Sequence, residues 1–146
     1  MLGQLGLVLA LGLGALGSAI GIGIAGQAAA GAWAKQARSD APLSFNYIIL
    51  LGMPISQTLY AMILMRKMLG TPPEIVAAEG ALLLSIGLSG GLAEMFSAFM
   101  QGKIGAAAIR CLAESGKGFA FLIIAMGIVE TVGILGLAFL YIAVPG

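Results

Sequence analysis

Four long runs of apolar residues constrain this chain more than any other feature of its sequence. They cover residues 5–33, 45–65, 75–100 and 118–144. The hydrocarbon core of a bilayer is about 30 Å thick, and a helix needs roughly 20 apolar residues to cross it. With 60% hydrophobic and 9% charged residues, the composition excludes an ordinary soluble domain. The sequence therefore predicts an all-α membrane protein with four transmembrane helices.

The basic residues of the predicted loops indicate the orientation in the membrane. Five lie in or next to the first and third loops, and two lie next to the second: Lys35, Arg38, Lys103, Arg110 and Lys117 against Arg66 and Lys67. Lysine and arginine are enriched in cytoplasmic loops. We therefore expect the first and third loops to be cytoplasmic and both termini to face outside.

The two halves of the chain resemble each other. The stretch GQAAAGAWAKQ from Gly26 resembles GKIGAAAIRCL from Gly102, and PISQTLYAMIL from Pro54 resembles GIVETVGILGL from Gly127. Self-similarity of this kind predicts a duplicated helical hairpin.

The expected boundary between the hairpins divides a single membrane domain into residues 1–70 and 71–146. Each hairpin contains two helices, so both copies enter the membrane in the same direction, as a parallel repeat. In this alignment Gln57 matches Glu130. One copy therefore carries a carboxylate where the other carries a neutral amide.

Small residues line one face of the first and third predicted helices. They are Ala10, Gly14, Gly17, Gly21, Ala25 and Ala28 in the first helix, and Gly87, Gly90, Gly91, Ser97, Ala98 and Gly102 in the third. Such stripes let helix backbones approach closely in lipid. The stripes fit a single four-helix bundle, and they fit equally a ring of many copies with the first and third helices in its inner circle.

A single carboxylate, Glu130, lies in the middle of the last apolar run. A charge at the bilayer centre costs at least ~2.5 kcal/mol on insertion scales, so such a residue predicts a functional site. We expect it to carry a proton or a cation rather than to stay bare. Folding each hairpin symmetrically about its loop predicts that Glu130 lies level with Gln101, and Gln57 level with Ala25.

Polar residues of the second predicted helix share one face through i+3 and i+4 spacing: Met53, Ser56, Gln57 and Tyr60. Pro54 interrupts the helical hydrogen bonds and frees the carbonyl of Leu50. A proton needs only the carboxylate, whereas Na⁺ needs several oxygen ligands. The surplus of amide and hydroxyl oxygens favours a metal cation. The alternative for Ser56, Gln57 and Gln101 is hydrogen bonding between helices.

The segments MPISQTLY, FMQGK and IVETVGILG, within a duplicated hairpin of this length, resemble the rotor-ring proteolipid of V-type ATPases. The resemblance is closest to the bacterial Na⁺-transporting type. It implies an ion site made by the side chains of Glu130, Gln101, Gln57 and Ser56 and the backbone carbonyl of Met53, closed by Tyr60. Serine stands at position 56 where that family has threonine.

The same resemblance implies a homo-oligomeric ring in which each subunit binds one ion at Glu130. The ring would turn past a stator membrane subunit whose basic residue displaces the ion. Central-stalk subunits would join the loops around Arg38 and Glu114 to a soluble ATPase head. The chain has no phosphate-binding loop ending in GK[ST], so it is not expected to be an enzyme. We expect it to lie in a prokaryotic plasma membrane and to bind no nucleic acid.

Three alternatives stay open at this point. The first is a rotor ring of the same family that carries protons instead of Na⁺. The second is a small four-helix multidrug antiporter, although these proteins typically have their glutamate on the first helix, where this chain has no acid. The third is a structural bundle or pore without transport.

Glu94 is a second acid within an apolar run, seven residues before Gln101 and beside Ser97 and Gly90 on nearly the same face. The resemblance assigns it no role. It is expected either to be protonated and bonded to a neighbour or to face the central opening of the ring, and a role in transport stays a third alternative.

Overall fold

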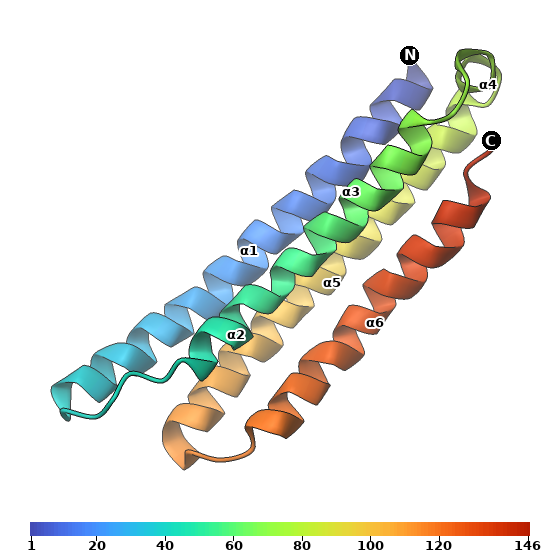
Figure 1. Ribbon diagram of the computed structural model, residues 1–146. Helices are drawn as coiled ribbons and strands as arrows, with labels where there is room; N and C mark the ends of the chain where they lie inside the picture. Colours follow the sequence, from blue (N-terminus) through green and yellow to red (C-terminus); the bar gives the residue numbers. More distant parts are fainter.

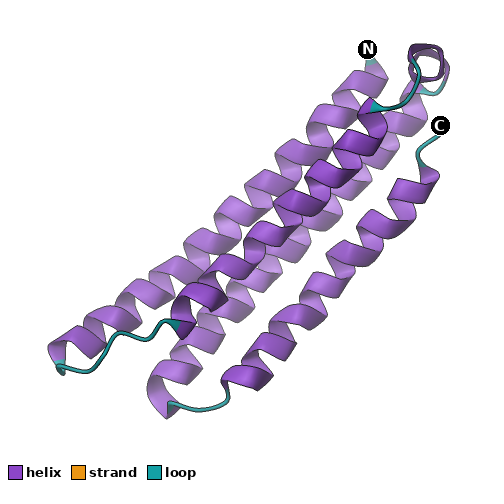
Figure 2. Cartoon of the chain, viewed as in Figure 1, coloured by secondary structure: helices purple, strands orange, loops and turns teal.

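The computed structural model describes residues 1–146, and most of them lie in long helices that run side by side (Figures 1 and 2). The elements are α1 (Leu2–Arg38), α2 (Asn46–Gly52), a 3₁₀ turn η1 (Met53–Ile55), α3 (Ser56–Leu69), α4 (Pro73–Ala78), α5 (Gly80–Ser115) and α6 (Phe119–Ala143). Because α2, η1 and α3 form one continuous span, four helical segments are long and apolar enough to cross a membrane. The prediction of an all-α protein with four transmembrane helices is confirmed.

Helices α1 and α5 are longer than the apolar runs that predicted them, with 37 and 36 residues. Each spans about 55 Å at 1.5 Å per residue, well beyond the hydrocarbon core. The predicted range 75–100 was wrong at both ends. Pro72 and Pro73 begin the separate short helix α4, and α5 continues past Lys103 and Arg110 because charged residues lower the hydropathy without breaking a helix.

The helices alternate in direction. Helices α1 and α5 run the same way, whereas the α2–α3 segment and α6 run back (Figure 1). Both termini and α4 lie at one end of the molecule, and the two hairpin loops lie at the other. The two hairpins are therefore parallel, as expected. Which end faces the cytoplasm stays a prediction.

Contact between α1 and α5 is close enough to exclude side chains. A Cβ atom added at Gly6 would meet the backbone of Leu83, one at Gly87 would meet the backbone of Gly6, and one at Gly102 would meet the backbone of Gly21. The predicted small-residue stripes thus form the tightest helix pair of the molecule. Helix α6 packs far more openly and buries only Met126 and Gly133 along its length.

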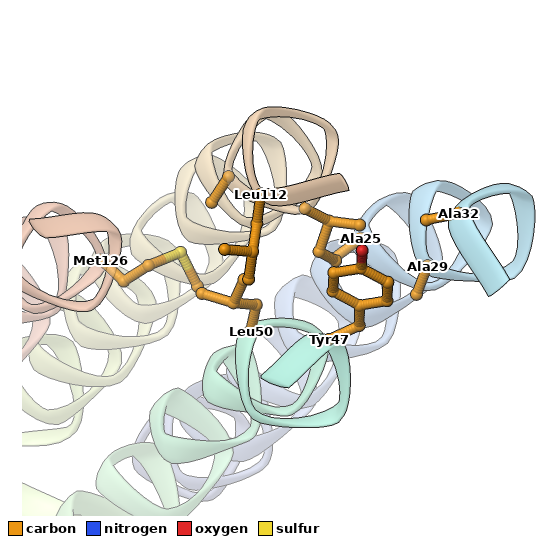
Figure 3. Close-up of a cluster of buried hydrophobic side chains, with 9 residues drawn as sticks. Ala25, Ala29, Ala32, Tyr47, Leu50, Leu112 and Met126 are labelled. Carbon is orange, nitrogen blue, oxygen red and sulfur yellow. The ribbon is translucent and has the colours of Figure 1, made fainter. Parts of the chain in front are cut away.

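Two clusters of buried apolar residues lie at different depths of the bundle. One, toward the hairpin loops, contains Ala25, Ala29, Ala32, Tyr47, Leu50, Ala108, Ile109, Leu112 and Met126 (Figure 3). The other, toward the termini, contains Ala10, Leu64, Met68, Leu83, Ile86 and Val144. The buried polar residues of the membrane-spanning segments lie between these two clusters.

Candidate ion-binding site

The layer between the two apolar clusters contains most of the buried polar side chains of the protein. Its buried members are Ser18, Gln57, Glu94, Ser97 and Gln101, and Glu130 joins them from α6 as a half-buried residue. The structure contains no group of three or more His, Cys, Asp and Glu side chains that could hold a metal ion. Any cation here would therefore depend on amide, hydroxyl and backbone oxygens beside the carboxylate.

The 3₁₀ turn η1 shapes one side of this layer. Pro54 has no N–H, so the helical hydrogen-bond pattern breaks there and the backbone tightens. The Met53 carbonyl accepts a hydrogen bond from Ser56 Oγ at 3.0 Å. The Pro54 carbonyl accepts one from Ser18 Oγ of α1 at 2.6 Å. The turn thus directs two carbonyls toward hydroxyl groups, and α1 fixes its position.

Glu130 is linked to the opposite hairpin by one hydrogen bond. The hydroxyl of Tyr60 on α3 donates to Glu130 Oε1 at 2.8 Å. A hydrogen bond to a carboxylate is stronger than one between neutral groups. This contact between Tyr60 and Glu130 joins α3 to the open helix α6.

A chain of hydrogen bonds runs from η1 across α5 to the backbone beside Glu130. Ser56 Oγ lies 3.2 Å from Gln57 Oε1, Gln57 Nε2 donates to Ser97 Oγ at 3.2 Å, and Ser97 Oγ donates to the Val129 carbonyl at 3.1 Å. Sequence reasoning assigned Ser97 only to the small-residue stripe. Its position one turn before Gln101 on the same helix face could have indicated this second role.

Gln101 lies at the edge of the polar layer. Its Nε2 donates to the Met126 carbonyl at 3.3 Å, whereas its Oε1 is buried and has no hydrogen-bond partner. The expectation that Gln101 lies level with Glu130 was wrong by about one helical turn, because Ser97 contacts the residue next to Glu130. The loop between α5 and α6 turns through Gly116 and Gly118, both with positive φ, so the hairpin does not fold symmetrically about its tip.

The register of the first hairpin also differs from the symmetric estimate. The side chain of Thr58, next to Gln57, donates to Ser18 at 2.8 Å, so Gln57 lies about two turns from Ala25. The cause is the extended loop before α2, whose residues advance about 3.3 Å each instead of 1.5 Å. Trp33 Nε1 donates to the Ser44 carbonyl at 2.9 Å and holds this loop back along α1.

Three of the six residues expected to form the ion site take part in hydrogen bonds that join α3 to α5 or α6: Gln57, Tyr60 and Glu130. Met53 and Ser56 bond to each other where η1 meets α3. Gln101 lies one turn away and bonds to a different carbonyl of α6. The roles of the six residues as ion ligands stay predictions.

The structure bears on one of the two positions expected for Glu94, a bond to a neighbour, while its position relative to the opening of a ring stays a prediction. Its side chain is 2% exposed, and its Oε2 has no hydrogen-bond partner. The carboxyl points toward Gly133 of α6. It therefore faces an interior helix contact of the chain and is not bonded to a neighbour through Oε2.

Comparison with known proteins agrees with this architecture. The model of the family of ATP synthase C subunits matches residues 5–65 and 84–143, which make up most of the chain. Each matched segment covers most of two of the four membrane-spanning helices. A search of curated proteins found no match.

Proposed function

The chain belongs to the family of ATP synthase C subunits, and from this premise we propose that it is the Na⁺-carrying ring subunit of a V-type ATPase. Members of the family are non-catalytic, ion-carrying subunits of membrane rotor rings, and ATP is hydrolysed elsewhere in the complex. The assignment favours a rotor ring over the four-helix antiporter and over a structural bundle. The choice of ion and the V-type assignment are the proposal.

The unpaired oxygen of Gln101 is the observation that carries the choice of Na⁺. Gln101 Oε1 is buried, has no donor and lies about one turn from Glu130 in the same polar layer. A buried acceptor without a partner is costly, and a bound cation would satisfy it. A proton on Glu130 needs no such ligand. Ser56, Gln57 and the Met53 carbonyl would supply further oxygens to the same ion.

Release of the ion follows from the position of Glu130 on the open helix. Tyr60 and Glu130 close the site through a bond between side chains, which can break without unfolding either helix. A basic residue of the stator subunit would attract the carboxylate, compete with the cation and open this bond. The ring would then turn by one subunit, driven through the central stalk by the soluble ATPase head.

The fused double hairpin supports the V-type assignment. The chain carries one mid-membrane glutamate for four helices, because Gln57 takes the matching place in the first hairpin. Each transported charge moves against about 2.3 kcal/mol per 100 mV. Fewer ions per turn leave more of the energy of each ATP for each ion, which favours pumping over synthesis.

Labelling of Glu130 with a hydrophobic carbodiimide tests the choice of ion. The reagent attacks protonated carboxyls, and the purified ring would be labelled across a grid of Na⁺ concentrations and pH values. We expect Na⁺ to slow the modification of Glu130 in competition with H⁺, and Glu130→Gln to lose the labelled site. Labelling of Glu130 that Na⁺ leaves unchanged at every pH would instead assign the ring to protons.

A further inference from the structure

The second buried acid, Glu94, occupies a notch that α6 leaves open. A Cβ atom added at Gly133 would lie 2.6 Å from Glu94 Oε2 and 3.3 Å from Ser97 Oγ, so any larger residue would collide with the carboxyl. On the other side, the Glu94 Cβ lies in ordinary contact distance of Gly14 on α1, 3.5 Å from where a Cβ would be. The missing side chain of Gly133 thus makes room for the Glu94 carboxyl.

No positive charge balances Glu94. Its Oε2 receives no hydrogen bond, and the carboxyl points toward Gly133, one helical turn along α6 from a second acid, Glu130. The Tyr60 hydroxyl already donates to Glu130. Helix α1 contributes none, because its first charged residue, Lys35, lies near its far end. An ionised carboxylate in this position would be buried without a partner, which is strongly unfavourable.

The small number of oxygen atoms that could serve as ligands beside Glu94 favours a proton over a metal cation. Besides its own carboxyl, the side-chain oxygen identified at the notch is Ser97 Oγ, which already accepts from Gln57 and donates to the Val129 carbonyl. A cation such as Na⁺ requires several oxygen ligands, whereas a proton requires only the carboxyl itself.

The internal repeat matches each of the two buried acids of the second hairpin with a residue of the first hairpin. The alignment that matches Gly26 with Gly102 pairs Glu94 with Ser18, and the alignment that matches Pro54 with Gly127 pairs Glu130 with Gln57. Ser18 bonds to the Pro54 carbonyl. The first hairpin therefore has two neutral residues at the positions where the second has two carboxyls.

We propose that Glu94 is a second ion-binding carboxyl that holds a proton while Glu130 holds the transported ion, so that each subunit binds two ions at once. The proposal rests on Glu130 as the transport site but applies whichever ion it carries. The proton on Glu94 keeps the pair at one negative charge, and its loss would add a second negative charge one turn from Glu130. Ion binding at Glu130 thereby becomes coupled to the protonation of Glu94.

Infrared spectroscopy of the intact ring in lipid tests directly whether Glu94 is protonated, because protonated carboxyls have a carbonyl stretch that shifts in D₂O. At neutral pH and saturating Na⁺, we expect one protonated carboxyl per subunit. Glu94→Gln should remove this band, and Glu74→Gln, which changes an exposed glutamate, should leave it unchanged. A spectrum without a Na⁺-resistant band that depends on Glu94 would overturn the proposal.

The variant Glu130→Gln keeps the test decisive if Glu94→Gln does not assemble. Glu94 is then the only carboxyl within the polar layer, and its protonated band should remain. Absence of that band at neutral pH would also refute the proposal. Failure of the Na⁺ assignment would look different from failure of this proposal. In the parent ring, Na⁺ would then leave the Glu130 band unchanged while the Glu94 band persists.

A binding titration gives the functional readout. Raising the pH removes the proton from Glu94 and adds a negative charge near Glu130, so Na⁺ should bind more tightly in an additional alkaline step. Glu94→Gln stays neutral and should lose this step while keeping the step due to competition at Glu130. Identical pH profiles for the parent ring and Glu94→Gln would show that no proton on Glu94 is coupled to the ion.

Discussion

At the scale of single residues, the site depends on a few side chains that meet across three elements. Tyr60 reaches Glu130, Ser97 connects Gln57 to the backbone of α6, and Gln101 leaves one oxygen without a donor. Two of these side chains have a counterpart of nearly the same shape that lacks one function: glutamine lacks the charge of Glu130, and phenylalanine lacks the hydroxyl of Tyr60. The contributions of ionic charge, hydrogen bonding and packing can therefore be separated by substitution.

Replacing Glu130 by glutamine keeps the shape of the side chain and removes its charge. We expect Glu130→Gln to abolish ion transport while the ring still assembles, because the carboxylate contributes the charge and only a minor part of the packing. ATP-driven ²²Na⁺ uptake into vesicles that contain the whole complex measures transport, and native mass spectrometry measures assembly. Uptake at the parental rate would show that Glu130 does not carry the ion.

Tyr60→Phe removes one hydroxyl and its hydrogen bond to Glu130. A hydrogen bond to a charged group contributes about 1.5–3 kcal/mol, so we expect Na⁺ affinity to fall at least roughly tenfold. The Na⁺ concentration that protects Glu130 from carbodiimide is the measurement. Tyr141→Phe changes a tyrosine that has no hydrogen bond to Glu130 and should leave affinity unchanged; equal losses in both variants would contradict a specific role for Tyr60.

At the scale of elements, α1 and α5 form the rigid pair against which the others are placed. Their glycines bring the backbones into direct contact, and α5 supplies Glu94, Ser97 and Gln101 from one face. Helix α6 has few buried residues and carries Glu130. The ion-carrying carboxylate thus lies on the most openly packed helix, while most of its polar neighbours lie on well-packed helices.

Substituting glycine in the α1–α5 contact should separate these helices. Gly17→Ala places a methyl group against the backbone of Met95, and overpacking of this kind costs typically 1–3 kcal/mol. We expect a lower melting temperature of the purified ring, measured by circular dichroism. Gly31→Ala on the same helix meets open space in the chain and serves as the control. Equal melting temperatures for Gly17→Ala and the parent would argue against close packing at this glycine.

At the scale of the whole molecule, the two parallel hairpins place both termini at one end and both hairpin loops at the other (Figure 1). Lys35, Arg38 and Arg110 are exposed on α1 and α5 near the hairpin loops. This basic end is the surface that we expect to face the cytoplasm and to contact the central stalk.

The single cysteine can test this orientation without a new substitution. Cys111 is exposed near the hairpin-loop end of α5. We expect a membrane-impermeant maleimide to label it in inside-out vesicles and not in right-side-out vesicles, with Cys111→Ser as the unlabelled control. The reverse pattern would place the hairpin loops outside.

The sequence by itself determined the four membrane-spanning helices, the duplicated hairpin, the small-residue stripes and Glu130. These features follow from local composition, because hydropathy, helical spacing and the cost of a buried charge act on each segment separately. The sequence also indicated that Glu94 is unusual, though without a place for it in the structure.

Only the tertiary structure decided which residues share a depth in the bundle. The register between helices depends on how far each loop residue advances, and the extended segment held by Trp33 shifts α2 and α3 by about two turns relative to a symmetric hairpin. The second hairpin has its own register, with a loop that turns through Gly116 and Gly118: it places Ser97 beside Val129, separates Gln101 from the level of Glu130, and directs Glu94 at Gly133. Loop conformation and backbone contact are properties of the folded whole, so no local pattern in the chain could specify them.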